Sequence, residues 1–72
     1  MGAKSDLAAF GAEVRRHRVL RGLSQTALSE KIGCSIKQLN NVEYARNWPS
    51  MTVYLALCRE LGVETPIETW AA

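Results

Sequence analysis

The chain has 72 residues, about half the length usually assigned to one domain, which excludes two separate cores and a large enzyme pocket. Hydrophobic residues make up 47% of it, but nine residues are alanine and only five are aromatic, so we expect a thin, closely packed core. The net charge of +2 is uneven, because residues 1–47 carry eight Lys or Arg against four Asp or Glu and residues 48–72 carry one against three, and this asymmetry favours contact of the first part with a polyanion.

Glycine and proline residues divide the chain into four or five segments with helical spacing of apolar residues, and no strand alternation is visible. The first segment has Ser5 as its expected N-cap and places Leu7, Phe10 and Val14 three and four residues apart. It ends at Gly22, which suits the left-handed position after a helix. We therefore predict a first helix of about four turns with these apolar residues on its buried face.

Two short segments follow. The second begins at Ser24 and stops at Gly33, and the third begins at Ser35, with Gln38 placed to complete a capping box, and runs to about Tyr44. In the second segment Leu28 and Ile32 lie four residues apart, and in the third Leu39 and Val42 must face inward.

A fourth helix is predicted to open at Pro49-Ser50 and to close at Gly62, with Val53, Tyr54, Leu57 and Leu61 at core spacing. Thr65-Pro66-Ile67-Glu68 combines a cap with proline at the first helical position, which predicts a last short turn that carries Trp70. The expected fold class is all-α.

The junction of the second and third segments, residues 24–44, has the arrangement of a helix-turn-helix motif: a short helix, a tight turn and another short helix. Once its inward residues are placed, the third segment presents mostly hydrogen-bonding side chains. Lysine donates to guanine O6 and N7, and glutamine or asparagine can bond an adenine edge, so this segment has the chemistry for reading the major groove. The alternative is an ordinary solvated helix face. The outward residues are Ile36, Lys37, Gln38, Asn40 and Asn41.

A set of motifs runs through residues 10–63: Gly22-Leu23-Ser24-Gln25, Leu28, Lys31-Ile32-Gly33-Cys34-Ser35, Asn41-Val42-Glu43, Pro49-Ser50, Leu57 and Leu61-Gly62-Val63. With these motifs, residues 10–63 resemble the Cro/repressor helix-turn-helix family, also called the XRE type. The sequence departs from the family pattern at Ser29, Ala45 and Trp48. The resemblance implies a compact four- to five-helix lambda-repressor-like DNA-binding domain, and from the chain length we expect residues 1–72 to form a single domain.

The resemblance, taken position by position, divides the expected DNA contacts into two groups. Those expected to approach base edges are Ile36, Lys37, Gln38 and Asn41. Ile36 could pack against a thymine methyl group or be a partly exposed residue at the edge of the core. Those expected to bind phosphates, including the start of the second helix with its backbone N–H groups, are Ser24, Gln25, Ser35, Asn40, Arg46 and Asn47.

Arg18 continues the apolar stripe of the first helix and matches a family position whose arginine pairs with the glutamate at Glu43, so we assign both residues to a structural ion pair. Arg15, Arg16 and Arg21 point in several directions from the same helix. We expect them to be solvated, with phosphate contact as the alternative.

No catalytic constellation is present, because His17 has no nucleophile or partner and the carboxylates are scattered, so we predict that the chain is not an enzyme. Cys34 and Cys58 are 24 residues apart and the chain has one histidine, so neither a metal site nor a cofactor is expected. Both cysteines are read as small apolar fillers. The sequence has no membrane-spanning stretch and no signal peptide, so we expect a cytoplasmic protein of prokaryotic or phage origin.

The expected function is a sequence-specific DNA-binding transcription regulator of the Cro or controller type, a repressor that binds double-stranded DNA as a homodimer on an inverted repeat. We expect the dimer contact in residues 62–72, through Ile67 and Trp70, unless Trp70 packs on its own core. The alternative is a protein-interaction module such as an antitoxin or adaptor, with a toxin or polymerase as partner. Trp48, Tyr54 and Trp70 favour that alternative, because aromatic residues are enriched in interfaces.

Overall fold

The computed structural model describes residues 3–63, with side chains from residue 6 onward, and this part of the chain contains helices and no strand. The helices are α1 (Ala3–Leu20), α2 (Gln25–Ile32), α3 (Ile36–Glu43) and α4 (Met51–Leu61). The all-α class predicted from the sequence is confirmed. The expected last turn, with Ile67 and Trp70, lies outside the described residues.

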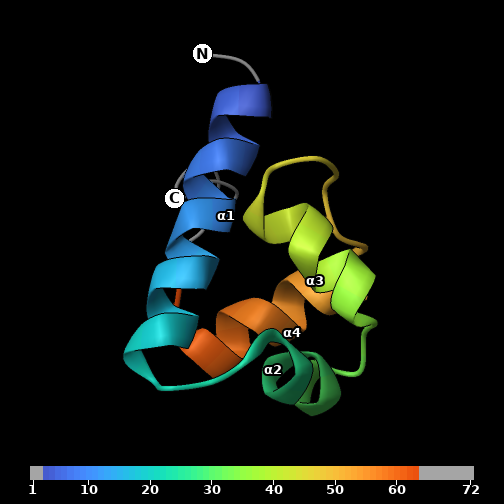
Figure 1. Cartoon of the computed structure of the whole chain (residues 1–72). Helices are drawn as coiled ribbons and strands as arrows, with labels where there is room; N and C mark the ends of the chain where they lie inside the picture. The colour runs from blue at the N-terminus through green and yellow to red at the C-terminus, as the bar shows by residue number, and fades with distance from the viewer. Residues whose placement is uncertain (1–2, 64–72) are drawn as a thin grey trace.

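The long helix α1 stands beside a group formed by the three shorter helices (Figure 1). It packs against α3 and α4, and α2 packs against the same two helices. Leu7, Phe10 and Val14 are buried, as their spacing predicts. The expected N-cap at Ser5 is wrong, because α1 already begins at Ala3; alanine and lysine are good helix formers, and they extend the helix past the residue with the better cap side chain.

Each helix contributes at least one fully buried side chain to a single core. An aromatic cluster closes the core beside the loop between α3 and α4, where the Phe10 ring lies 4.8 Å from the Tyr54 ring and 6.2 Å from the Trp48 ring, measured between centroids. One core therefore joins the four described helices, and each helix depends on the others for burial. The fully buried side chains are Phe10, Val14, Leu28, Leu39, Val42, Leu57 and Leu61.

The caps predicted from the sequence fix the helix-turn-helix motif. The Ser24 hydroxyl accepts a hydrogen bond from the backbone N–H of Ala27 at 3.0 Å, and Gly33 ends α2 with a φ of 75°. At the start of α3 the capping box is complete: the Ser35 hydroxyl accepts from the Gln38 N–H, and the Gln38 side chain accepts from the Ser35 N–H. These bonds satisfy backbone donors that a helix start leaves unpaired, so they set where α2 ends and α3 begins.

Helices α1 and α3 approach so closely that the contact needs a glycine. A Cβ atom at Gly11 would overlap the carbonyl oxygen of Val42 in α3. The apolar face of α1 thus meets the backbone of α3 itself at this point, and this fixes the distance between the two helices.

Ser29 occupies a position where the family pattern has alanine. It is buried, and its hydroxyl donates to the carbonyl oxygen of Thr26 at 2.8 Å. The hydroxyl therefore has a partner inside its own helix, and the larger side chain does not leave a buried polar group unpaired.

Candidate nucleic-acid interface

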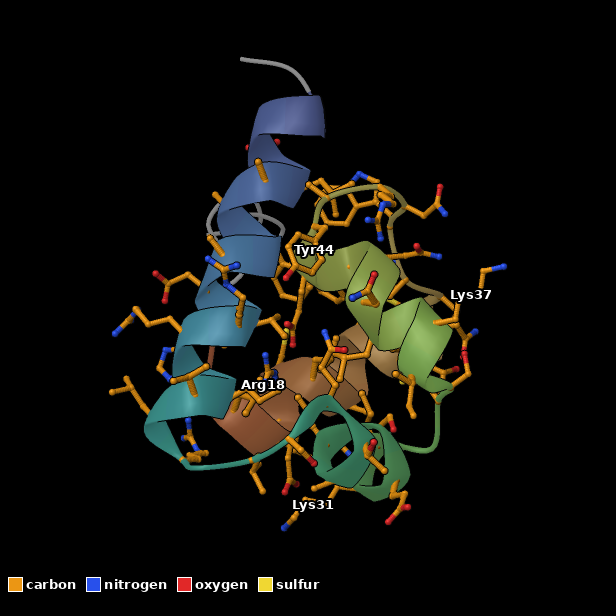
Figure 2. All side chains as sticks on the ribbon, viewed as in Figure 1. Arg18, Lys31, Lys37 and Tyr44 are labelled. Atoms are coloured by element: carbon orange, nitrogen blue, oxygen red, sulfur yellow. The ribbon has the colours of Figure 1, made fainter. Side chains whose placement is uncertain are left out.

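The outer face of α3 presents two of the predicted base-reading residues directly to solvent. Leu39 and Val42 hold the inner face in the core, and Ile36 at the start of the helix is 48% exposed. Lys37 points away from the bundle (Figure 2), and it has no hydrogen bond or ion pair within the described part of the chain. The exposed part of the Ile36 side chain and the Lys37 ammonium are therefore both available to an external partner.

The two amide residues assigned to base reading already have polar contacts within the chain. Gln38 is exposed, but its Oε1 accepts from the Ser35 backbone N–H at 2.9 Å, which leaves the Nε2 hydrogens available as donors. Asn41 is half-buried, and its Oδ1 lies 3.5 Å from Nη1 of Arg46. The capping bond thus holds the Gln38 side chain in one orientation before any ligand binds, which reduces the entropy it loses on binding.

The residues predicted to contact phosphate lie around the ends of α2 and α3, and several of them also have partners within the chain. Gln25 is half-buried, and its Nε2 donates to Oε1 of Glu43 at 3.1 Å. Asn40 accepts a hydrogen bond of 2.6 Å from Nη1 of Arg46. Ser24, Ser35 and Asn47 are exposed, and the two serines are the caps of α2 and α3.

Behind this face lies the ion pair predicted from the sequence. The Arg18 guanidinium donates from Nε to Oε2 of Glu43 at 2.7 Å and from Nη2 to Oε1 at 3.0 Å, and its Nη1 donates to the Leu23 carbonyl oxygen at 2.9 Å. The Glu43 side chain is fully buried and that of Arg18 is 14% exposed. The hydrogen bonds to Glu43 raise the pKa of Arg18 further above its usual range, so the guanidinium stays charged.

Glu43 therefore connects three helices: it belongs to α3, binds Arg18 of α1 and accepts from Gln25 at the start of α2. Its carboxylate oxygens both have donors, which is the condition for a buried charge to be tolerated. This network fixes α3 relative to α1 and α2, and so it sets the direction of the outer face of α3.

The other basic residues at and near the end of α1 have different partners. Arg16 pairs with Glu13 at 2.8 Å on an exposed face, beside the partly buried His17. Arg21 is exposed, as expected, and its Nη2 also donates to the Leu61 carbonyl oxygen at 3.0 Å. The last carbonyls of a helix lack partners within that helix, and Arg21 supplies one for the end of α4.

A contact that sequence reasoning missed joins Arg15 of α1 to the end of α3. Tyr44 is 53% exposed, with the Cζ of Arg15 5.8 Å and the Cζ of Arg46 5.4 Å from its ring centroid. The signal that could have revealed it is Gly11, because a small residue marks a close helix contact and Arg15 lies one turn further along the same face.

The remaining observations concern the predicted interface aromatics, the cysteines, metal ligands and membrane-spanning helices. Tyr54 is 4% exposed, so it is a core residue and does not supply an interface, contrary to the expectation that grouped it with Trp48 and Trp70. Burial raises the pKa of the Cys34 thiol, which favours its protonated form. Residues 3–63 contain no group of His, Cys, Asp and Glu side chains that could hold a metal ion, and none of their helices is long and apolar enough to span a bilayer.

A family model described as a helix-turn-helix domain matches residues 9–70. The chain belongs to this family. The helix-turn-helix domain is similar in structure to the restriction-modification controller protein C.AhdI from Aeromonas hydrophila, with a TM-score of 0.74 and 32% sequence identity over 83% of this chain and 91% of that one. The family predicted from the sequence is thereby confirmed.

The sequence is also similar to a propionyl-CoA carboxylase regulator from Cereibacter sphaeroides, with 43% identity over 54 residues. That stretch is 75% of this chain but only 12% of the regulator's length. Both similar proteins are named for regulation, and in this chain α2 and α3 form the helix-turn-helix motif.

Proposed function

We propose that this helix-turn-helix domain is a sequence-specific DNA-binding transcription regulator that reads the major groove with α3 and has no catalytic activity. The observation that carries this is the contrast within α3: its inner side is held by buried apolar residues and by the Arg18–Glu43 pair, and its outer side presents side chains able to read bases. A helix with a fixed inner side holds its outer side chains in one register against the groove.

Each outer residue has a role that its chemistry supports. Lys37 donates to guanine O6 and N7, and Ile36 packs against a thymine methyl group. Gln38 donates its Nε2 hydrogens to an acceptor on a base edge, since its oxygen is occupied by the capping box. Asn41 uses its amide on adenine.

The backbone contacts come from the ends of the two motif helices. The N–H groups at the start of α2, with Ser24 and Gln25, and the capping Ser35 supply donors for phosphate oxygens. Arg46, with Asn40 bonded to it, and Asn47 supply contacts after α3. These residues set the position of α3 on the duplex and carry no sequence information themselves.

A single recognition helix reads few base pairs, so we propose that the regulator acts as a homodimer on an inverted repeat with half-sites about 10 base pairs apart, centre to centre. Residues 62–72, with Ile67 and Trp70, supply the proposed contact, because the basic surface is used by DNA. We place the protein in the cytoplasm as a small repressor of the Cro or controller type, with residues 1–72 as one domain. The similarity to a controller protein supports this class.

The test of base reading starts with duplexes selected from a random pool by the protein and measures affinity by fluorescence anisotropy. We expect Lys37→Ala and Asn41→Ala to lose about 1 to 3 kcal/mol of discrimination each, which is about 5- to 150-fold, between a selected and a scrambled duplex. Lys31→Ala is the matched control, because Lys31 lies on α2 and pairs with Glu60. Equal losses on both duplexes would show that α3 does not read sequence.

The test of the dimer is sedimentation of the full chain and of its Trp70→Ala and Ile67→Lys variants at micromolar concentration. We expect the parent to sediment as a dimer and both variants to shift toward monomer, because each removes apolar area from the proposed contact. A dimer unchanged in both variants would place the contact elsewhere. A monomer that binds one half-site as tightly as a full repeat would contradict the dimer.

The alternative of a protein-interaction module is not favoured by the described residues. Of the aromatic residues that supported it, Tyr54 is buried, and the exposed Trp48 packs its ring against Phe10 and Tyr54. Trp70 lies outside the described residues.

A further inference from the structure

A basic and aromatic cluster lies between α1 and the end of α3. Its centre is the exposed ring of Tyr44, which lies between the two helices in Figure 2. The guanidinium groups of Arg15 and Arg46 lie within 6 Å of the ring centroid, at 5.8 Å and 5.4 Å, which is the range of a cation–π contact.

The backbone holds these groups in place from both sides. On α1, the close approach at Gly11 brings the following turn, with Arg15, against the end of α3. On α3, the N–H of Ala45 donates to the Val42 carbonyl oxygen at 3.1 Å and that of Arg46 donates to Asn41 at 2.8 Å. This is the Schellman arrangement at a helix end, and it turns the chain so that Arg46 returns toward Tyr44.

The charges of this cluster are not neutralised by the described residues. Arg16 and Arg18 on the same helix each pair with a glutamate, at 2.8 Å and 2.7 Å. No carboxylate within residues 6–63 pairs with Arg15 or Arg46, whose contacts are the Tyr44 ring and, for Arg46, the side chains of Asn40 and Asn41. Two unpaired cations beside one exposed phenol form a site suited to an anion that takes several donors at once.

We propose that Arg15, Tyr44 and Arg46 together bind a backbone phosphate of DNA next to the bases that α3 reads. This inference rests on the proposed function and adds Arg15 of α1 and the phenol of Tyr44 to the contacts given above. It makes α1 part of the DNA-binding surface.

The place of the cluster favours DNA over an acidic protein. Lys37 and Tyr44 lie at opposite ends of α3 (Figure 2), and a helix of eight residues is only about 12 Å long. A duplex contacted by Lys37 therefore passes close to the cluster, and its backbone carries a dense row of phosphates. Guanidinium groups bind phosphate oxygens in a fork, and the phenol donates a further hydrogen bond.

The test compares Arg15→Gln with Arg16→Gln, which removes the same charge from the neighbouring residue, on the side that pairs with Glu13. Affinity for a selected, fluorescein-labelled duplex is measured across a salt series, with thermal unfolding to show that both variants fold. We expect Arg15→Gln to reduce the slope of log K against log salt by about one, and Arg16→Gln to leave it unchanged. Affinity for the duplex falls for both proteins between 50 and 200 mM salt. The fold loss for Arg15→Gln should therefore be about 3.5 times smaller than the fold loss for the parent.

Tyr44→Phe separates the two parts of the site, because it keeps the ring under both guanidinium groups and removes the hydroxyl. We expect weaker binding with the parent slope, since the lost donor carries no charge. Equal slopes for the parent, Arg15→Gln and Arg16→Gln would overturn the inference. Capture of a polyglutamate peptide that depends on Arg15, with an unchanged DNA slope, would overturn it in favour of an acidic protein partner.

Failure of the proposed phosphate site can be distinguished from failure of the proposed DNA-binding function. If the parent binds no duplex above background, or if Lys37→Ala loses no discrimination, the DNA-binding function itself is wrong. If the parent binds DNA, Lys37→Ala loses discrimination and Arg15→Gln keeps the parent slope, only the role of Arg15 and Tyr44 is wrong.

Discussion

The two sides of α3 differ in burial and in bonding within the chain. On the inner side Leu39, Val42 and Glu43 are buried, and every carboxylate oxygen of Glu43 has a donor. On the outer side Ile36 and Lys37 are exposed, and neither side chain forms a hydrogen bond or ion pair with another described side chain. The inner side therefore determines the stability and the direction of α3, and the outer side is available for recognition. Substitutions on the two sides should therefore separate into losses of stability and losses of discrimination.

The largest expected effect is on the inner side. Glu43→Gln leaves the Arg18 guanidinium without a counter-charge in a mostly buried place, and breaking such a pair costs about 3 to 5 kcal/mol. That is comparable to the whole stability of a domain of this size. We expect the melting temperature, followed by circular dichroism, to fall by at least about 12 °C.

The matched control is Glu60→Gln, which breaks the ion pair of Glu60 with Lys31. Those side chains are 39% and 53% exposed, and their closest atoms are 3.4 Å apart. An exposed pair contributes at most about 1 kcal/mol, so this variant should melt within a few degrees of the parent. If Glu43→Gln and Glu60→Gln melted at the same temperature, the buried pair would not stabilise the fold and the contrast between the two sides would fail.

The second effect tests the close approach of α1 to α3. Gly11→Ala places a methyl group against the Val42 carbonyl oxygen, and backbone cannot move aside as a side chain can. Overpacking should cost about 3 kcal/mol, and the better helix propensity of alanine should return about 1 kcal/mol. We therefore expect the free energy of unfolding, measured by urea denaturation, to fall by about 2 kcal/mol.

The control for steric overlap is Gly22→Ala. No atom lies within 4 Å of a Cβ built at Gly22, but its φ of 67° is unfavourable for alanine. Its cost should be about 1 to 2 kcal/mol and should come from backbone conformation alone. A Gly11→Ala protein as stable as the parent would mean that α1 can move away from α3, in which case Arg15 would not be held against Tyr44.

Local signals in the sequence predicted most of the fold. Caps such as Ser24, Ser35 and Ser50 accept hydrogen bonds from backbone N–H groups three residues further along the chain, so their effect can be inferred without knowing the tertiary structure. The apolar spacing likewise predicted that Phe10 and Leu57 would be buried. At the start of α1 the same reasoning failed, because propensity outweighed the cap at Ser5.

Contacts between helices were harder to predict from the sequence. The Arg18–Glu43 pair was predicted through the family resemblance, since residues 25 positions apart give no local signal. The bond from Gln25 to Glu43 and the contact of Arg15 with Tyr44 depend on how closely α1, α2 and α3 approach one another. Residue spacing within one helix carries no information on that distance, apart from a glycine such as Gly11.

The smallest expected effect concerns Ala45, where the inner and outer sides of α3 meet at the end of the helix. Ala45 has a φ of 57°, the left-handed conformation that costs an ordinary residue about 1 to 2 kcal/mol and that glycine adopts without strain. Ala45→Gly should therefore stabilise the fold by about 1 kcal/mol after the greater entropy of unfolded glycine is subtracted, and raise the melting temperature by about 4 to 8 °C. The same substitution at Ala12, exposed in the interior of α1, should lower stability by about 0.5 to 1 kcal/mol. A loss of stability in both variants would show that the turn at Ala45 carries no strain, and that the path of Arg46 is set by its side-chain contacts instead.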